Sequence, residues 1–457
     1  MEHIFRAYDI RGIWNKDLDP DICLDLGRGL GTLMMDELGM RKAVVGYDVR
    51  KTSPAFHGAL VSGLLSTGVD VISTGECGFG VALHAGLSTG ADVSCFITAS
   101  HLEPEWNGLK MYFGNGIGFP EENILKIRDI VLSGKFRKVK WQDAGELSSL
   151  DHLDAYNSFW MERYLPLLKD GGISIGVDCG GGAMCLSAPK VLGSCGMNVE
   201  NVNSEVDPYF SNRPSEPKPE NLTDLRDRVV EKGLDFGIAF DGDGDRAVVC
   251  DETGRFLSTD RLGIIIARDL VLEYGGGVVL ANVESSMAVE DVLEPIGADV
   301  KRIKVGHTYL TMEAKETGAI FGVERSGHLI VPRHVLFDDA ITAPLEIARI
   351  LVKEKRPLSE IAIEVPQFAS RAFAFDCPDD EKFRVIASLT EELKGKYGNV
   401  NDMDGVRVDM EDGWVLMRCS NTSPVVRMTV EARDESSLNR ISNLFGDILK
   451  SMIDGTE

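Results

Sequence analysis

Three aspartates separated by single glycines stand near the middle of the chain, in the sequence DGDGDR at 241–246 (the aspartate loop). Asp241, Asp243 and Asp245 are followed directly by Arg246. Carboxylates this close repel one another unless a positive charge lies among them, so their spacing indicates a bound cation. Mg²⁺ takes a few carboxylates together with substrate phosphate oxygens, and Arg246 is placed to hold such a phosphate beside the metal.

A calcium loop of the EF-hand type is the competing metal site. That loop needs acids at its first, third and fifth positions, glycine at the sixth and glutamate at the twelfth. The three aspartates and Glu252 fit, but Arg246 stands where glycine must make the turn. The flanking runs 236–240 and 247–250 are predicted strands, whereas an EF-hand lies between helices. A solvated hairpin tip with no ligand is the other alternative.

A serine ends a predicted strand in the sequence FITASHLEPEWNGLKMY at 96–112 (the serine loop). At this position Ser100 would project into the crevice where α/β sheets bind ligands. His101 follows it directly, and Gly108 and Lys110 come further along. Ser100 is not part of a GxSxG motif, which argues against a serine hydrolase. A helix cap or a local turn is the alternative role for Ser100 and His101.

Glu324, Ser326 and His328 alternate along the sequence GVERSGHLIV at 322–331 (the sugar loop). An extended chain would place all three side chains on one face. Such a trio suits hydrogen bonding to the hydroxyls of a sugar, and His328 can move a proton near neutral pH. An exposed edge strand is the alternative.

Hydroxyls, an amide and two guanidiniums gather in the sequence RCSNTSPVVRMTVEA at 418–432 (the phosphate loop). These groups are suitable hydrogen-bond donors for a phosphate. A simple turn between strands is the alternative. The residues that carry these groups are Arg418, Ser420, Asn421, Thr422 and Arg427.

Alternating strand-like and helix-like segments must position these loops, and such alternation is typical of α/β proteins. In the first third, strands are predicted at 43–47, 69–73 and 93–97, with helices at 54–67 and 79–88 between them. The alternation recurs twice more before Pro366, which predicts three similar α/β domains with mixed sheets and helices on both faces.

After Pro366 the pattern changes to that of a smaller α+β domain. Its predicted strands are 371–375, 406–409, 414–418 and 426–432, and its predicted helices are 380–396 and 435–452. The predicted domains, which carry the serine, aspartate, sugar and phosphate loops in this order, are residues 1–148, 149–253, 254–367 and 368–457.

Composition limits the possible functions. Of the 457 residues 44% are hydrophobic, enough for several globular cores. The 48 basic and 72 acidic residues give a net charge of −24, which argues against binding to nucleic acid or an anionic membrane. Nine cysteines without a CxxC pair indicate reduced thiols, and no signal peptide or membrane span is recognisable. We expect a soluble, cytoplasmic protein.

Taken together and in this order, the motifs resemble those of the α-D-phosphohexomutase family, which includes phosphomannomutase/phosphoglucomutase and phosphoglucosamine mutase enzymes. The resemblance covers nearly the full length of the chain. It implies three similar α/β domains and a C-terminal fourth domain around one central cleft. The matching motifs are FRAYDIRG at 5–12, TASH at 98–101, the aspartate loop, GHTYL at 306–310, ERSGH at 324–328 and RCSNTSP at 418–424.

The resemblance also implies roles for individual residues. Ser100 would be a phosphoserine whose phosphoryl oxygen binds one Mg²⁺ per subunit together with Asp241, Asp243 and Asp245. The expected catalytic residues are Ser100, His101, Lys110, Arg246 and His328. The expected substrate-binding residues are Arg11, His307, Glu324, Ser326, Arg418, Ser420, Asn421, Thr422 and Arg427.

The implied activity is that of a phosphosugar mutase, which interconverts hexose 1-phosphate and hexose 6-phosphate through the phosphoserine and a bound 1,6-bisphosphate. Mannose and glucose phosphates are the favoured substrates, with phosphoglucosamine mutase or phosphopentomutase activity as the alternative. A phosphatase with an aspartate nucleophile and a calcium-binding module are less favoured. We expect a sugar 1,6-bisphosphate as activator, a phosphosugar as the partner, and a monomer or homodimer.

Three departures from the family pattern bear on the substrate. Leu102-Glu103-Pro104 follows the serine and histidine where the family usually has Asn-Pro. Val323 replaces a glycine before Glu324, and Asp338-Asp339-Ala340 stands where many members have Asp-Gly. The last two departures lie in the predicted sugar-recognition domain and leave the choice of sugar open.

Overall fold

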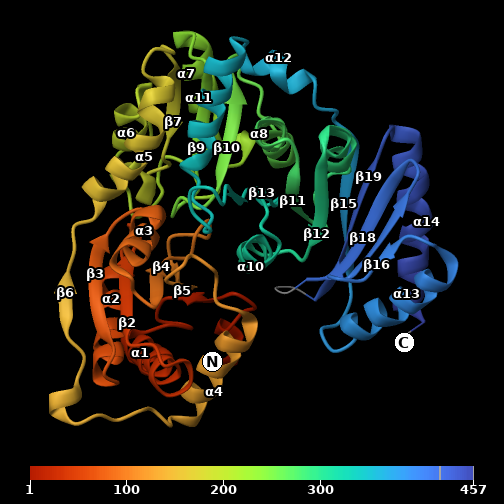
Figure 1. Cartoon of the computed structure of the whole chain (residues 1–457). Coiled ribbons are helices and arrows are strands. Elements are labelled where there is room, and N and C mark those ends of the chain that lie inside the picture. The colour runs from red at the N-terminus through yellow and green to blue at the C-terminus, as the bar shows by residue number, and fades with distance from the viewer. Residues whose placement is uncertain (421–423, 456–457) are drawn as a thin grey trace.

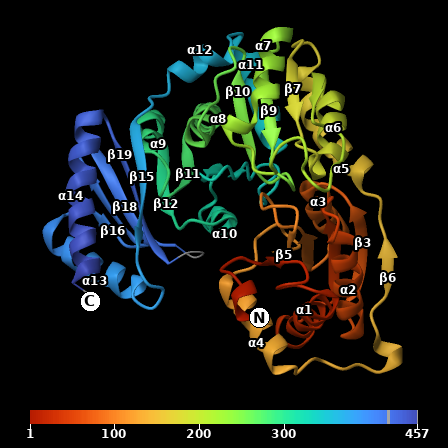
Figure 2. The ribbon, with the colours of Figure 1, turned by 180° about the vertical axis from the view of Figure 1, so that it is seen from behind.

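The computed structural model describes residues 1–420 and 424–455. The strands of these residues form four sheets, which follow one another along an arc (Figure 1). The first and fourth sheets lie at the two ends of the arc, as the view from behind also shows (Figure 2). The predicted fold class, three α/β parts and a smaller C-terminal α+β part, is confirmed.

The first sheet has the strand order β1-β5-β4-β2-β3-β6. All residues of β4 are buried; Val93, Cys95 and Ile97 join one hydrophobic cluster and Phe96 another, as expected of a central strand covered on both faces. The strands are β1 (Asp9–Ile13), β2 (Lys42–Tyr47), β3 (Asp70–Glu76), β4 (Val93–Ile97), β5 (Trp106–Phe113) and β6 (Leu147–Ser149). The helices of this part are α1 (Pro20–Thr32), α2 (Ser53–Ser66), α3 (Phe79–Thr89) and α4 (Glu121–Ser133).

The second and third sheets have the strand orders β10-β9-β7-β8 and β12-β11-β13-β14. The second contains β7 (Ser174–Asp178), β8 (Asn198–Val202), β9 (Phe236–Phe240) and β10 (Ala247–Asp251), with α5 (Leu153–Leu168), α6 (Ala188–Ser194) and α7 (Thr223–Lys232). The third contains β11 (Gly277–Asn282), β12 (Ala298–Ile303), β13 (Phe321–Val323) and β14 (Leu329–Ile330). Its helices are α8 (Thr259–Tyr274), α9 (Ala288–Leu293), α10 (His307–Thr317), α11 (Thr342–Glu354) and α12 (Leu358–Ile363).

Two antiparallel hairpins carry loops with candidate site residues. Strands β9 and β10 flank the aspartate loop, as predicted. Strands β13 and β14 flank residues 324–328, which do not form the extended chain that would place Glu324, Ser326 and His328 on one face. These residues form a turn, in which the backbone N–H of Gly327 donates to the carbonyl of Glu324 at 3.1 Å. Gly327 has φ +113°, a conformation that favours glycine, so the turn replaces the strand.

The fourth sheet is antiparallel, with the strand order β15-β19-β18-β17-β16. Apolar residues of α13 and α14 form a hydrophobic cluster with the sheet, which gives this part its own core. Its strands are β15 (Ala369–Asp376), β16 (Val400–Asn401), β17 (Val406–Met410), β18 (Gly413–Cys419) and β19 (Val425–Ala432). Its helices are α13 (Lys382–Lys396) and α14 (Glu435–Asp454).

One hydrophobic cluster continues through the first three sheets. It joins Phe79 of α3, Trp160 of α5, Phe236 of β9 and Ile266 of α8, all buried. The shared core fixes the three α/β parts against one another. The exact domain limits at 148, 253 and 367 stay a prediction.

Polar and apolar contacts attach the fourth sheet to the third. Arg407 of β17 donates to the carbonyl oxygens of Val283 at 2.7 Å and Ser285 at 3.3 Å. Trp414 and Leu416 of β18 are buried in a small cluster with Val283. The turn that follows β11 therefore contacts the fourth sheet through both polar and apolar groups.

All nine cysteines are unpaired, and seven of them are buried. Among the described residues, no helix combines the length and the apolar character that crossing a membrane requires.

Glycines let α1 and α2 cross closely. A methyl group on Gly63 would overlap the carbonyl oxygen of Leu24, whereas one on Gly58 of the same helix would meet open space. Gly63→Ala is therefore expected to lower the free energy of unfolding by about 1–3 kcal/mol. The control Gly58→Ala should raise it by about 0.5–1 kcal/mol, because alanine restricts the unfolded chain. Urea unfolding measures both, and equal effects would contradict the close crossing.

Candidate active site

The carboxylates of the aspartate loop lie in the interior of the protein. Asp241 and Asp243 are fully buried, Asp245 is nearly so, and one oxygen of each lies within 4.8 Å of the others. Asp241 Oδ1 shapes the loop by accepting from the backbone N–H of Gly244 at 3.0 Å and of Arg246 at 3.2 Å. The alternative of a solvated hairpin tip is wrong, because a solvated tip would expose these side chains.

Lys110 of β5 reaches across from the first sheet to the aspartate loop. Its Nζ donates to Asp243 Oδ2 at 2.8 Å and also pairs with Asp245 Oδ2. Only 2% of the Lys110 side chain is exposed, so the interaction is hardly screened by water. The structure therefore brings together two motifs that stand more than a hundred positions apart in the sequence.

The charges of this cluster shift one another's pKa values. Burial and the neighbouring Asp243 and Asp245 raise the pKa of Asp241 well above its ordinary value. Burial opposes ionisation of Asp245 too, but Lys110 and His328 outweigh it and hold the pKa of Asp245 well below its ordinary value. Burial would lower the pKa of Lys110, yet Asp243 and Asp245 raise it. The cluster thus keeps an ammonium among its carboxylates.

The donor set fits Mg²⁺. Asp243 Oδ1 and Asp245 Oδ1 are buried and have no hydrogen-bond partner, so these two oxygens are available as ligands. Asp241 adds a third carboxylate, and hard carboxylate oxygens are the ligands that Mg²⁺ takes.

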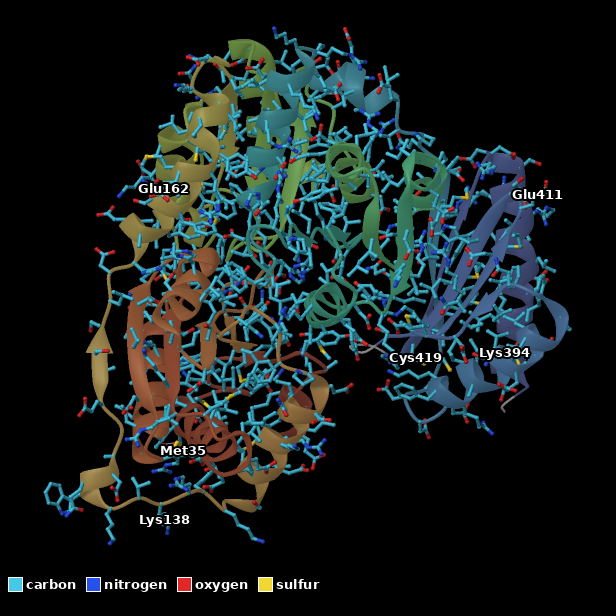
Figure 3. The ribbon with its side chains drawn as sticks, in the orientation of Figure 1. Met35, Lys138, Glu162, Lys394, Glu411 and Cys419 are labelled. Carbon is cyan, nitrogen blue, oxygen red and sulfur yellow. The ribbon has the colours of Figure 1, made fainter. Side chains whose placement is uncertain are left out.

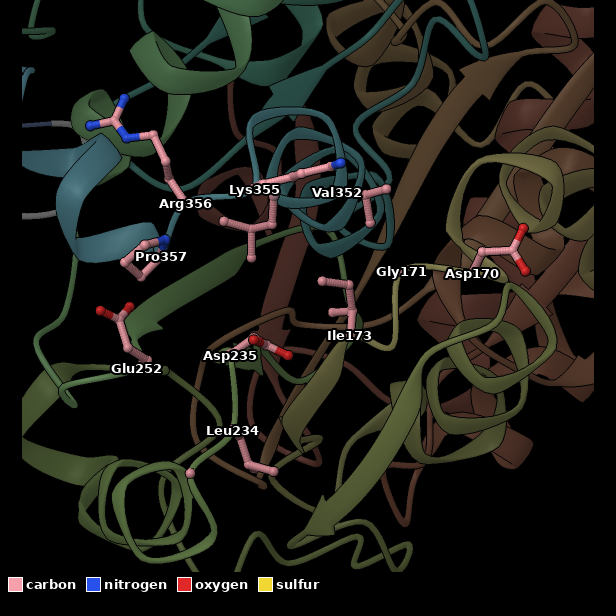
Figure 4. A pocket seen from close by; sticks show the side chains of 12 residues that line it. Asp170, Gly171, Ile173, Leu234, Asp235, Glu252, Val352, Lys355, Arg356 and Pro357 are labelled. Carbon is pink, nitrogen blue, oxygen red and sulfur yellow. The ribbon is translucent and has the colours of Figure 1, made fainter.

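The EF-hand alternative fails on the position of its glutamate. Glu252 follows β10 at the end opposite the aspartate loop and accepts from the backbone N–H of Ser359 at 3.1 Å. It lines a separate cavity of about 700 Å³ with Asp235, Lys355 and Arg356 (Figure 4). Its carboxylate cannot complete a metal shell with the three aspartates.

Ser100 lies beside the aspartates. Its Oγ donates to Asp241 Oδ2 at 2.8 Å and lies 3.3 Å from His101 Nδ1. Ser100 is fully buried and has a left-handed backbone with φ +53°, which costs a non-glycine residue about 1–2 kcal/mol. Burial, with the cations of Arg246 and Arg11 nearby, lowers the pKa of His101 to about 2, so this ring is neutral.

The turn of the sugar loop buries Glu324 and His328 and leaves Ser326 exposed. Glu324 Oε1 accepts from the backbone N–H of Gly306 at 2.6 Å, and Ser326 Oγ lies 3.4 Å from Glu324 Oε2. Burial raises the pKa of Glu324. The alternative of an exposed edge strand is wrong, because Glu324 and His328 are buried.

His328 links the aspartate loop to Asp338. Arg246 Nε lies 2.9 Å from His328 Nε2, and because a guanidinium only donates, this nitrogen accepts. The proton of the neutral ring therefore stands on Nδ1, 2.6 Å from Asp338 Oδ2. Burial lowers the pKa of His328 to about 4. His307, His328 and Asp338 could also surround a metal, but Arg246 already occupies Nε2 of His328.

The N-terminal motif meets the GHTYL motif. Tyr8 donates to the carbonyl of Val305 at 2.6 Å, and its ring packs edge-on against His307 with the centroids 5.9 Å apart. Arg11 of β1 donates to Asp9 at 2.6 Å and lines a cavity of about 650 Å³ beside Tyr8. These contacts place Arg11 and His307 on adjoining parts of the first and third sheets.

The phosphate loop begins at the end of β18, where Cys419 is labelled in Figure 3. Arg418 Nη1 donates to Glu284 Oε1 at 3.0 Å, and its Nη2 lies 3.3 Å from Asp404 Oδ2. Glu284 belongs to the third-sheet part of the chain, so this pair bridges two parts. A phosphate that approaches Arg418 must compete with both carboxylates.

Arg427 lies on β19 of the fourth sheet, which stands at the opposite end of the arc from the first sheet (Figures 1 and 2). Ser420 is buried and Arg427 is exposed on β19. Asn421 and Thr422 lie outside the described residues.

Three buried charged residues of this region were not predicted as site residues. Asp338 accepts from Tyr112 and lies 2.6 Å from His328 Nδ1, and Arg50, paired with Asp48, donates to the carbonyl of Ser100. A usable signal was present for Asp48 and Arg50. They follow the predicted strand at 43–47, and neighbouring parallel strands end at the same edge of a sheet.

Comparisons with known families cover most of the chain. Residues 2–138, 154–254 and 258–368 match the phosphoglucomutase/phosphomannomutase alpha/beta/alpha domains I, II and III. Residues 374–445 match the phosphoglucomutase/phosphomannomutase C-terminal domain.

Individual proteins are similar over their full lengths. A probable phosphoglucosamine mutase of Methanopyrus kandleri is 35% identical over 99% of each chain. A phosphoglucomutase/phosphomannomutase of Thermococcus kodakarensis is 33% identical over 100% of each chain. The crystal structure of a phosphoglucomutase/phosphomannomutase family protein from Burkholderia thailandensis has a TM-score of 0.91 at 27% identity, over 99% of this chain and 98% of that chain.

Removal of the buried ammonium should expose the repulsion among the aspartates. Lys110→Met is expected to lower the free energy of unfolding by about 3–5 kcal/mol without metal, because it leaves buried carboxylates unpaired. MgCl₂ should raise the melting temperature of this variant more than that of the wild type. Lys126→Met, at an exposed ion pair, is the control. A variant as stable as the wild type in EDTA would contradict this account.

A buried carboxyl next to the site should make stability depend on pH. Asp339 accepts from the Tyr156 hydroxyl at 2.7 Å, and burial raises its pKa from 3.8 to about 7. The folded state therefore holds this proton more tightly, and its contribution to stability falls as pH rises between about 4 and 7. Asp339→Asn should remove that part of the fall in urea unfolding. Asp154→Asn, at an exposed position, should not.

Proposed function

Because the chain belongs to the phosphoglucomutase/phosphomannomutase family, it is a phosphohexomutase, and we propose that Ser100 carries the phosphoryl group that it transfers. The phosphoryl passes from Ser100 Oγ to the free hydroxyl of a hexose 1-phosphate or 6-phosphate, which gives a bound 1,6-bisphosphate. After the sugar turns over, Ser100 Oγ takes the other phosphoryl. The Oγ–phosphorus bond that breaks in the first step is thus remade in the second.

The observation that carries this proposal is the position of Ser100. Its hydroxyl lies 2.8 Å from Asp241, inside a buried cluster of three carboxylates and one ammonium. A phosphoryl on this oxygen would join a cluster in which Asp243 Oδ1 and Asp245 Oδ1 have no hydrogen-bond partner. An aspartate nucleophile, as in the phosphatase alternative, would not require a serine here.

Asp241, Asp243 and Asp245 would hold one Mg²⁺ together with the phosphoryl oxygen, and the ion would neutralise negative charge on the transferring group. Lys110 and Arg246 supply fixed positive charge at the same place. Phosphoryl transfer needs mainly such charge and in-line positioning.

His328 is suited to take the proton of the attacking hydroxyl. The proton of its neutral ring lies on Nδ1, 2.6 Å from Asp338 Oδ2, so Nε2 is the basic nitrogen. Arg246 occupies Nε2 in this structure, and a substrate phosphate that draws the guanidinium away would free it. Glu324 and Ser326 of the sugar loop would bind hydroxyls of the ring.

The phosphate that does not react would bind at the fourth sheet. Arg418 offers a guanidinium there, and its present partners Glu284 and Asp404 would give way to the more highly charged phosphate. Ser420, Asn421, Thr422 and Arg427 would contribute further donors. His307 and Arg11 would contact substrate from the first and third sheets.

We assign mannose and glucose phosphates as first candidate substrates, with glucosamine phosphate as the second. The name of the relative from Methanopyrus kandleri supports the second, and that of the relative from Thermococcus kodakarensis supports the first. A coupled isomerisation assay across mannose, glucose, glucosamine and pentose phosphates, primed with a trace of sugar 1,6-bisphosphate, separates them.

Replacement of the serine tests the mechanism. Ser100→Ala should lose nearly all mutase activity and keep its melting temperature, because the change removes the phosphoryl carrier and little volume. Mass spectrometry of the wild type should find one phosphate on the peptide that contains Ser100, at a level that rises with sugar 1,6-bisphosphate. Ser62→Ala, on the exposed face of α2, is the control.

Two results would refute the proposal. One is wild-type turnover by Ser100→Ala. The other is a phosphate that maps to an aspartate of the aspartate loop, which would favour the phosphatase alternative.

A further inference from the structure

A fully buried arginine lies beneath the serine loop. Arg50 stands three positions after β2, and its side chain is 0% exposed. Its hydrogen bonds go to the protein itself, so it has a different task from the arginines assigned to phosphate. A buried guanidinium that gives its donors to backbone fixes that backbone in place.

The two terminal nitrogens of Arg50 hold carbonyl oxygens of one loop. Nη2 donates to Ser100 at 2.8 Å and to Leu102 at 2.8 Å. Nη1 donates to Glu103 at 2.5 Å and to Trp106 at 3.2 Å. Four carbonyls within seven residues of the serine loop thus converge on a single side chain.

The third side of the guanidinium is fixed by Asp48. Arg50 Nε donates to Asp48 Oδ2 at 3.0 Å, and the backbone N–H of Arg50 donates to Asp48 Oδ1 at 3.1 Å. Ser53, at the start of α2, donates its hydroxyl to the same Oδ1 at 2.6 Å. The guanidinium is therefore anchored to residues that directly follow β2 of the first sheet, and its terminal nitrogens extend to the serine loop.

The serine loop needs such an anchor because its backbone is strained. Ser100 has φ +53°, a conformation that a non-glycine residue leaves unless its surroundings hold it. A side chain on Gly242 of the aspartate loop would overlap the Ser100 carbonyl oxygen, so the two loops touch at this atom. Arg50 holds that same oxygen from the other side.

Residues next to the second sheet also contact Arg50 and the serine loop. The ring of Phe210 lies 5.1 Å from the Arg50 guanidinium carbon, in a cation–π contact. Ser215 donates its hydroxyl to the carbonyl of Leu102 at 2.9 Å. The position of the serine loop is thus tied to the docking of the first sheet on the second.

We propose that Arg50 is a positioning residue for phosphoryl transfer. It locks the backbone of Ser100 so that Oγ, and the phosphoryl it carries, points at the three aspartates. The inference rests on the proposed role of Ser100. Lysine cannot replace Arg50, because an ammonium presents its donors from one nitrogen and cannot span four carbonyls and a carboxylate.

Arg50→Lys tests this role. Because a misplacement of about 1 Å can cost on the order of 100-fold, kcat should fall by about that factor. KM for the sugar phosphate should stay at the wild-type value, since no sugar or phosphate contact is changed. Arg137→Lys is the matched control, because this arginine also binds a backbone carbonyl (Thr67) and a carboxylate (Asp36). Both partners lie outside the serine loop. This control variant should keep wild-type kcat.

Chemical rescue separates positioning from a loss of stability. In Arg50→Ala, added methylguanidinium should restore part of kcat, whereas methylammonium at the same concentration should not. If the alanine variant does not fold, Asp48→Asn serves instead. It keeps the volume, releases the anchor of the guanidinium, and should lower kcat with KM unchanged.

The inference is overturned if folded Arg50→Lys or Asp48→Asn has wild-type kcat, or if KM rises while kcat is retained. Ser100→Ala is measured in parallel. If that variant is active, the proposed function itself fails. If it is inactive while Arg50→Lys turns over normally, only the role of Arg50 fails.

Discussion

Mutual repulsion among three buried carboxylates is the constraint around which this structure is arranged. Each ion taken from water into the interior costs several kcal/mol, so Asp241, Asp243 and Asp245 cannot stand together without positive charge. Lys110 supplies one ammonium, and its pKa and that of Asp245 shift apart as a result. Two carboxylate oxygens, Asp243 Oδ1 and Asp245 Oδ1, remain without a hydrogen-bond partner. The family's magnesium dependence fits this remaining demand for a cation.

The same constraint explains why the first three sheets share a core. The aspartates lie on a hairpin of the second sheet, Lys110 on a strand of the first, and His328 on a turn of the third. An ion pair across such boundaries is stable only if the parts stay in register. The continuous cluster around Phe79 and Trp160 provides that rigidity. The fourth sheet has a separate core, and its Arg418 meets the third-sheet part through an ion pair with Glu284.

The sequence correctly predicted those strands and helices that are determined by the residues within them. The strands around the aspartate loop, the strand before Ser100 and the helices at 54–67 and 79–88 were predicted, because apolar runs and turn residues determine them directly. The sequence pattern left the conformation of the sugar loop open. Alternating polar residues favour a strand, but the left-handed Gly327 and the hydrogen bond of Glu324 to Gly306 stabilise a turn. That second contact comes from another strand–helix connection and is invisible to a local pattern.

The sequence by itself determined the α/β class, the order of the four loops and the kinds of chemical group that each loop carries. Tertiary structure alone decided which groups meet. Lys110 pairs with aspartates 133 and 135 positions away, and Arg246 fixes the proton of His328 on the nitrogen that faces Asp338. Such pairings depend on how sheets dock and on which charges remain after water is excluded. Burial strengthens the interactions between charged groups, because the dielectric constant of the interior is lower than that of water. Burial is a property of the whole fold.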